Sequence, residues 1–269
     1  MESLLKEVCP MKGKKIIQPI VGALLIAAGV VAIVLTHGGA TAENAAAKAL
    51  VPFALGWIAA VIGLLVFVVG FLPPRKITNV RTLTMAAMFA ALCYVGFAYF
   101  QIKIPVGDDS TSFHLGNVFC VLAALCIGGM WGGLAGAVGM TIGDLFDPVY
   151  ITSAPKTFVL KLCIGLIAGL LAHKVFKISR DKASRKVPLP VSTVLSCAAG
   201  MAFNIVADPL VGYVYKMYVL GIPQDAAKLL AKMSALTTSV NALIAVVAAS
   251  VFYMALRPAL KKARLLPEL

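Results

Sequence analysis

Three ionisable side chains stand inside apolar segments of this chain. Asp144 and Lys161 lie within consecutive apolar runs, and Asp208 lies in a later one, directly before a proline. A charge inside a hydrophobic segment is costly and is usually kept for a ligand, an ion or a partner charge. These groups are therefore candidates for contact with a polar ligand. The structural alternative is an ion pair between helices for Asp144 and Lys161, and a capped proline kink for Asp208.

Amide side chains occur in similar places. Asn117, Asn204 and Asn241 each lie inside an apolar run. Asn204 stands one helical turn before Asp208, so the two share one face of a helix. An amide within a membrane either hydrogen-bonds a ligand or joins neighbouring helices. His114 is a weaker candidate, because a histidine at the start of a span is more often a loop or capping residue. With three scattered histidines, the sequence predicts neither a metal cluster nor a cofactor.

The composition is that of a membrane protein. The 269 residues are 61% hydrophobic and 13% charged, whereas soluble domains are about 45–50% apolar and about 25% charged. Eight apolar segments approach the roughly 20 residues that cross a bilayer. They are 16–36, 50–72, 81–100, 114–129, 131–146, 157–175, 191–215 and 233–256. We therefore expect an all-α membrane protein with eight spans.

A short basic linker divides the chain. The sequence Pro-Pro-Arg-Lys at 73–76 follows the second span, and proline cannot continue a helix. It separates a plain two-helix leader, residues 1–76, from a core of six spans, residues 77–269. All of the polar candidates lie in the core.

The basic residues predict the orientation. Most of the 24 Lys and Arg residues fall in connections on the side of the N-terminus, and cytoplasmic loops carry such an excess. We therefore expect both termini in the cytoplasm. The same bias explains the net charge of +13 without any binding of nucleic acid.

The polar candidates gather in one half of the core. At 1.5 Å of rise per residue, they fall in the half of the bilayer that faces outward in this orientation. The inward halves of the same segments carry no charge. A continuous pore would need polar residues through its full depth. The pattern favours a cup that opens to the outside over a channel.

The outer loops also carry polar groups. A polar loop at 107–117 contains Asp108 and Asp109, which are interpreted as solvated charges. Tyr150 is interpreted as part of an aromatic belt at the outer interface, or as a residue that stacks on a flat ring.

Small residues form stripes with a spacing of four. Glycines between 128 and 143 are expected to let helices pack closely inside the bundle. The 81–100 segment carries the pairs Ala86–Ala90 and Ala87–Ala91 near its cytoplasmic end. Spacing alone does not decide whether this alanine face serves internal packing or docking to another membrane protein.

Several catalytic motifs are missing from the sequence. It has no G-x-x-x-x-G-K-[ST], so it does not bind ATP through a P-loop. It also has no H-E-x-x-H and no G-x-S-x-G. The six cysteines form no C-x-x-C pair and are interpreted as buried free thiols.

Four motifs of the core occur in a familiar order. They are His-Leu-Gly-Asn-Val-Phe at 114–119, Gly-Gly-x-x-Gly-Gly-Leu-Ala-Gly at 128–136, Gly-Asp-Leu-Phe-Asp-Pro at 143–148 and Ala-Pro-Lys-Thr-Phe-Val-Leu-Lys at 154–161. Together they resemble the substrate-binding S component of energy-coupling factor (ECF) vitamin transporters, and the riboflavin-type S components in particular. The resemblance covers about 78–257, and the leader departs from the usual six-helix pattern.

The resemblance implies a fold, a function and partners. The fold would be a six-helix S-component bundle preceded by two extra transmembrane helices, in the plasma membrane of a prokaryote. S components are not enzymes. They bind a vitamin or a vitamin precursor from the outside and hand it inward, together with a transmembrane coupling protein and two ABC-type ATPases.

The same resemblance assigns roles to residues. The predicted substrate-binding residues are Asp144, Lys161, Asp208, Asn204, Asn241, Asn117 and His114. The alanines that match the family's A-x-x-x-A docking motif, and so are predicted to face the coupling protein, are Ala86, Ala87, Ala90 and Ala91.

Two other functions are alternatives for this chain. A stand-alone secondary transporter driven by an ion gradient is disfavoured by the mostly apolar inner half. An intramembrane aspartyl protease would need Asp144 and Asp208 to share a proton. Its G-x-G-D pattern lacks the first glycine here, since residues 141–144 read Thr-Ile-Gly-Asp. The sequence does not choose among vitamins.

Overall fold

A computed structural model describes residues 80–107, 109–180, 187–263 and 265–266 of the chain. They belong to the second of two units into which the chain divides, residues 79–269. The two spans expected before residue 76 lie outside the described residues.

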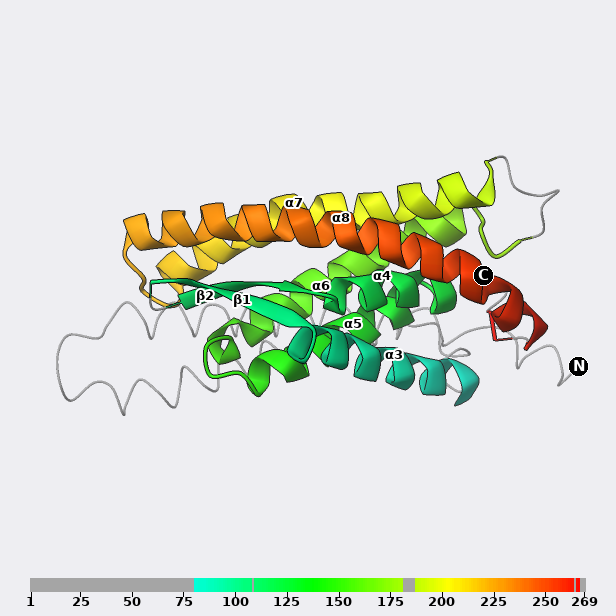
Figure 1. Cartoon of the computed structure of the whole chain (residues 1–269), viewed down its shortest axis with the longest axis horizontal. Coiled ribbons are helices and arrows are strands. Elements are labelled where there is room, and N and C mark those ends of the chain that lie inside the picture. The colour runs from blue at the N-terminus through cyan, green and yellow to red at the C-terminus, as the bar shows by residue number, and fades with distance from the viewer. Residues whose placement is uncertain (1–79, 108, 181–186, 264, 267–269) are drawn as a thin grey trace, which may run out of the picture. The chain divides into compact units, whose positions relative to one another are not determined.

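Six α-helices and one β-hairpin make up the described part of this unit (Figure 1). The elements are α3 Val80–Ala98, β1 Gln101–Val106, β2 Asp109–His114, α4 Gly116–Ile127, α5 Gly129–Leu145, the 3₁₀ turn η1 Ile151–Ser153, α6 Ala154–Leu170, the π-helical turn η2 Leu171–Val175, α7 Leu189–Tyr218 and α8 Gln224–Lys262. Helices α7 and α8 run side by side along one face, α3 and α5 lie along the other, and α4 and α6 lie between them.

The six helices fall where six core spans were expected. Among the described residues, four are long and apolar enough to cross a membrane: α3, the stretch Ile151–Val175, α7 and α8. Helix α4 differs most from the expectation, because its 12 residues reach only about 18 Å. The segment expected at 114–129 is therefore a short helix preceded by a strand.

That strand, β2, belongs to a β-hairpin, whereas a loop was expected from residue 107 onward. β1 and β2 pair in antiparallel register from Gln101↔His114 to Val106↔Asp109. Gly107, with a φ of 63°, begins the connection in a conformation that glycine adopts freely. Backbone outside a helix is tolerated at membrane depth where it is buried in protein and its polar groups are paired.

Glycines bring α5 against its neighbours, as expected. Gly132 lies against the backbone of Ala124 on α4, and Gly133 lies against Gly165 on α6. A side chain at any of these positions would collide with the partner's backbone. The close approach lets polar side chains on α5 and α6 share one space.

The end of the bundle away from the hairpin is packed with apolar side chains. Leu125, Ile164, Ala249 and Ile178 are fully buried there. The Arg257 guanidinium donates to the Ile178 carbonyl at 3.0 Å and closes this end. The half of the described core away from the hairpin is therefore filled with apolar side chains.

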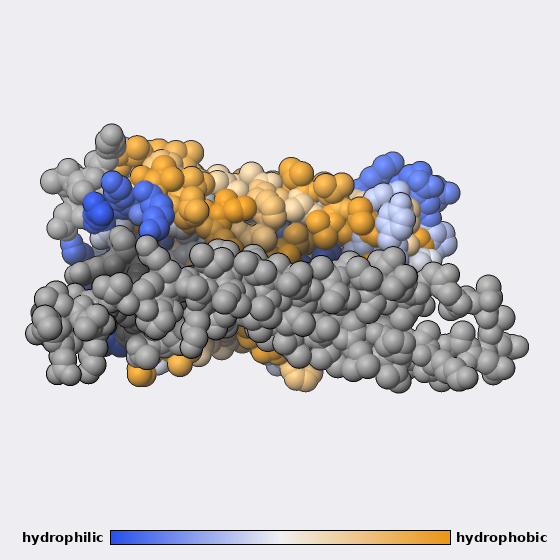
Figure 2. Space-filling view, turned by 180° about the vertical axis from the view of Figure 1, so that it is seen from behind, coloured by the Kyte–Doolittle hydropathy of each residue, from blue (hydrophilic) through white to orange (hydrophobic). Residues whose placement is uncertain are grey.

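The outside of the bundle is apolar across its middle. Figure 2 shows hydrophobic side chains over the central part of the visible face and hydrophilic ones at both ends. On α8, Leu243, Val247 and Val251 are all more than half exposed and recur every four residues. Such a stripe suits contact with lipid tails, and it supports the assignment as a multi-pass membrane protein.

Candidate functional site

A polar cavity lies at the hairpin end of the bundle, between β2 and helices α4 to α8. Its empty space, including the part that is open to solvent, is about 840 Å³. The structure brings all seven predicted substrate-binding residues to its wall: His114, Asn117, Asp144, Lys161, Asn204, Asp208 and Asn241. Contact with a substrate stays a prediction for each of them.

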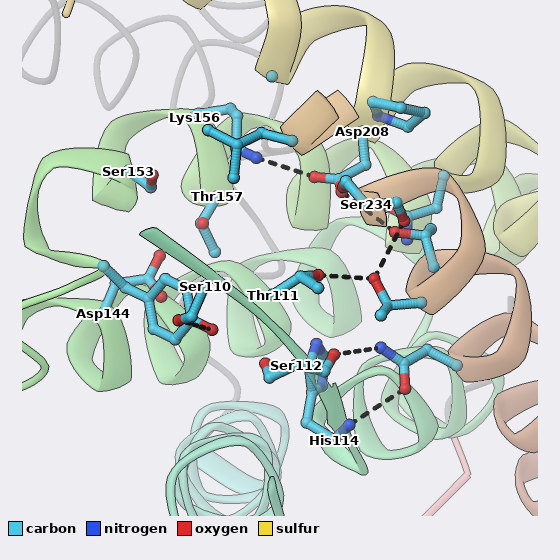
Figure 3. A pocket seen from close by; sticks show the side chains of 18 of the residues that line it. Ser110, Thr111, Ser112, His114, Asp144, Ser153, Lys156, Thr157, Asp208 and Ser234 are labelled. Carbon is cyan, nitrogen blue, oxygen red and sulfur yellow. Dashed lines mark hydrogen bonds and ion pairs between the residues drawn. The ribbon is translucent and has the colours of Figure 1, made fainter. Parts of the chain in front are cut away.

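Asp208 joins three helices at one side of the cavity (Figure 3). Its Oδ1 atom accepts from the Lys156 ammonium at 3.0 Å. Its Oδ2 atom accepts from the Ser234 hydroxyl at 2.7 Å and from the Thr238 hydroxyl at 3.1 Å. Both oxygens are thus occupied by side chains of α6 and α8. Asp208 lines the cavity, but its geometry is that of a residue that positions Lys156.

Asn241 fastens the hairpin to α8. Its side-chain nitrogen donates to the Ser112 carbonyl at 2.9 Å, and its oxygen accepts from the His114 backbone N–H at 3.1 Å. The hydroxyls of Thr111 and Thr237 form a second bond between β2 and α8, at 2.6 Å. The amide of Asn241 thus replaces the strand partner that β2 lacks on this side.

Asp144 and Lys161 are held differently. Asp144 is 2% exposed, and it interacts with the Thr157 side chain. Its Oδ2 atom has no hydrogen-bond partner among the described residues. Lys161 is 7% exposed, and its ammonium forms no ion pair with any described carboxylate. Figure 3 shows Asp144 well separated from the Asp208 cluster.

Three neutral side chains add open polar atoms to the wall. Within the described part of the chain, Asn117 Oδ1, Asn204 Oδ1 and His114 Nδ1 are buried without a hydrogen-bond partner. Buried polar atoms are nearly always paired, so these three atoms are free to hydrogen-bond a ligand or water in the cavity.

Ion pairs hold the hairpin over the cavity. Lys216 of α7 pairs with Asp109 at the tip of β2, and Lys103 of β1 pairs with Asp147 after α5. The interpretation of Asp109 as a solvated charge is therefore wrong, because α7 brings a lysine to it. Since Lys216 also lines the cavity, the tip of the hairpin lies beside the cavity.

Aromatic rings form one wall of the cavity. The rings of Phe97 and Tyr150 lie 6.2 Å apart, and Phe97 meets His114 edge-on at 4.9 Å. The Ser110 hydroxyl donates to the Tyr150 hydroxyl at 2.8 Å. Burial raises the pKa of Tyr150, although the Ser110 hydrogen bond opposes this, so the phenol stays neutral at physiological pH. Tyr150 thus lines the site rather than serving only as a belt residue.

One family of known proteins matches this chain. The sequence model of the family described as "ECF-type riboflavin transporter, S component" matches residues 76–258, about two thirds of the chain. This chain is an ECF S component. The family is one of substrate-binding transporter subunits and not of enzymes. In the described residues, both oxygens of Asp208 bond to Lys156 and to the α8 hydroxyls. No curated protein and no solved structure matched the chain.

The matched region of this S component contains cavity residues that sequence reasoning missed. Lys156, Thr157 and Lys216 line the cavity, as do the hydroxyl residues of β2 and α8. Lys156 belongs to the Ala-Pro-Lys-Thr motif, and its charge at the start of an apolar run is a signal that could have found it. Strand β2 could have been predicted from its partner β1. In β1, Ile102, Ile104 and Val106 alternate with polar or turn-forming residues over 101–106.

Some alanines of the α3 face are buried in the bundle and others are exposed on its surface. On α3, Ala86 is buried and Ala90 is half-buried against Gly139 of α5, whereas Ala87 and Ala91 are exposed. Ala86 is therefore not available to a partner in this structure. The predicted docking role stays a prediction for Ala87 and Ala91.

Proposed function

We propose that this S component captures a vitamin or vitamin precursor from outside the cell for an ATP-driven importer. The observation that supports this most strongly is a polar cavity with unpaired buried atoms inside an otherwise apolar bundle. The match to a riboflavin transporter family makes riboflavin the first compound to test.

The direction of capture rests on charge. The cavity opens beside the hairpin, while Lys174, Lys177, Arg257 and Lys261 lie toward the opposite end of the bundle. Basic residues favour the cytoplasmic side of a membrane. The mouth of the cavity would then face outward, and the packed apolar end would face the cytoplasm.

The energy would come from other subunits. The sequence has no P-loop, so a transmembrane coupling protein and two ABC-type ATPases would supply ATP hydrolysis. The exposed Ala87 and Ala91 of α3 offer a flat surface to such a coupling protein.

Identification of the bound small molecule tests this proposal. The full chain is purified in mild detergent, and the compound released on denaturation is identified by mass spectrometry. We expect one vitamin-like compound in near-stoichiometric amount, and its loss in an Asn204→Leu variant but not in an Asp225→Asn variant, since Asp225 is exposed on α8. If no compound co-purifies and riboflavin does not bind, the proposed function is wrong.

A further inference from the structure

The charges around the cavity balance, but they are not all paired. Lys156 pairs with Asp208, and Lys216 pairs with Asp109. That leaves Asp144 and Lys161, one acidic and one basic side chain, both buried and both lining the cavity.

These two groups do not neutralise each other directly. They stand on neighbouring helices, α5 and α6, yet no ion pair joins them among the described residues. A buried charge without a counterion carries a large desolvation cost. Because each faces the same cavity, one molecule in that cavity can supply a counterion to both.

The polar atoms near the Asp144 carboxylate indicate which part of a ligand would lie beside it. Asp144 Oδ2 and the side-chain oxygens of Asn117 and Asn204 are acceptors that lack donors in the described chain. An ammonium or another group with several N–H donors would satisfy more than one of them. On the other side, Lys161 has only donors to offer, so it requires an acceptor, best an anion.

We propose that the substrate of this S component is a compact zwitterion, with its cationic, donor-rich group facing Asp144 and its anionic group facing Lys161. This inference rests on the proposed function and narrows the class of substrate. It favours a molecule with no net charge, because the cavity with its paired aspartate and lysine residues is itself balanced. An uncharged ligand would place no opposite charge beside either group.

Four benzene derivatives that differ in charge test the proposal. They are 4-(aminomethyl)benzoate, which is a zwitterion, benzylamine, which is a cation, benzoate, which is an anion, and benzyl alcohol, which is neutral. Each is titrated into the substrate-free full chain in detergent by calorimetry, beside riboflavin. We expect the zwitterion to bind about ten-fold or more tighter than any of the other three, the value of one added charge-assisted hydrogen bond.

Variants show whether the named side chains cause the preference. Asp144→Asn should abolish the advantage of the zwitterion over benzoate, and Lys161→Met its advantage over benzylamine. Asp144→Glu and Lys161→Arg retain the charges and should keep part of the preference. The exposed pair supplies matched controls, Asp225→Asn and Lys228→Met, and size-exclusion chromatography shows that each variant is folded.

The outcomes separate this inference from the proposed function. Tight binding of riboflavin that is unaffected by Asp144→Asn and Lys161→Met leaves the S-component function standing and overturns the zwitterion. Equal binding of all four probes, or of none, also overturns it. A preference for the zwitterion that disappears in both charge-removing variants supports it.

Discussion

At the level of single residues, the structure sorts the polar side chains of the cavity into two kinds. Asp208 and Asn241 have their polar atoms occupied by other parts of the chain. Asn204 and Asp144 keep an unpaired atom. The first kind should matter for folding and the second for binding.

The same substitution at two asparagines, one of each kind, tests this distinction. Asn241→Leu leaves two buried backbone groups of β2 unpaired and should lower the free energy of unfolding by about 2 kcal/mol or more. Asn204→Leu should leave stability unchanged or raised, yet weaken ligand binding about ten-fold or more. Thermal unfolding in detergent measures the first effect, and calorimetry with the co-purifying ligand measures the second. Equal effects of both variants on stability would contradict the distinction.

The ion pair of Lys156 and Asp208 makes a separate prediction. Lys156→Met leaves a partly buried carboxylate without its counterion and should destabilise the protein by about 3 kcal/mol. Lys156→Met combined with Asp208→Asn should cost much less, because no charge is then left unpaired. A double-mutant cycle of unfolding free energies measures the coupling. Additive costs would show that Ser234 and Thr238 alone hold the carboxylate.

At the level of elements, close packing at glycines sets the width of the cavity. Gly165 of α6 lies against the backbone of Gly133 on α5. Gly165→Val should therefore force the two helices apart and reduce the yield of monodisperse protein in size-exclusion chromatography. Gly212→Ala is the control for folding, because its added Cβ would meet only the Lys156 ammonium, at 3.5 Å. Normal yield and stability of Gly165→Val would mean that α5 and α6 tolerate separation.

The hairpin makes a prediction about rates. Lys216 holds the tip of β2 through Asp109 beside the mouth of the cavity. Asp109→Ala should speed ligand release several-fold, because the hairpin opens more often when this pair is lost. The exchanged pair, Asp109→Lys with Lys216→Asp, should restore slow release, as stopped-flow measurements can show. An unchanged release rate in Asp109→Ala would mean that the hairpin does not control the exit.

The positions of the core helices could be predicted from the sequence. The hairpin and the hydrogen-bond partners of the polar side chains could not. Apolar run lengths placed the core helices, and charges within those runs marked the cavity wall. The hairpin was missed because β1 is short and β2 consists of polar residues, which resemble a loop. The partners of Asp208 come from α6 and α8, 52 and 26 residues away. Only the fold could show which polar atoms are left open.

At the level of the whole molecule, the bundle separates a polar end from a filled end. The cavity, its unpaired atoms and the hairpin lie at one end. Apolar side chains and the Arg257 contact occupy the other. We therefore expect transport of a captured substrate to need a partner that moves or opens the bundle. The outer surface of α3 is where such a partner can be tested.

Ala87 and Ala91 are exposed on α3, while Ala86 is turned into the core. Ala87→Trp with Ala91→Trp should roughen this surface, leave ligand binding by the purified protein unchanged and abolish uptake of the ligand by cells that contain the coupling protein and ATPases. Val247→Trp is the matched control, since Val247 is 57% exposed on α8, away from α3. Ala86→Trp should instead damage folding, because no space exists for the ring. If the double variant still supports uptake, the coupling protein docks on another face of the bundle.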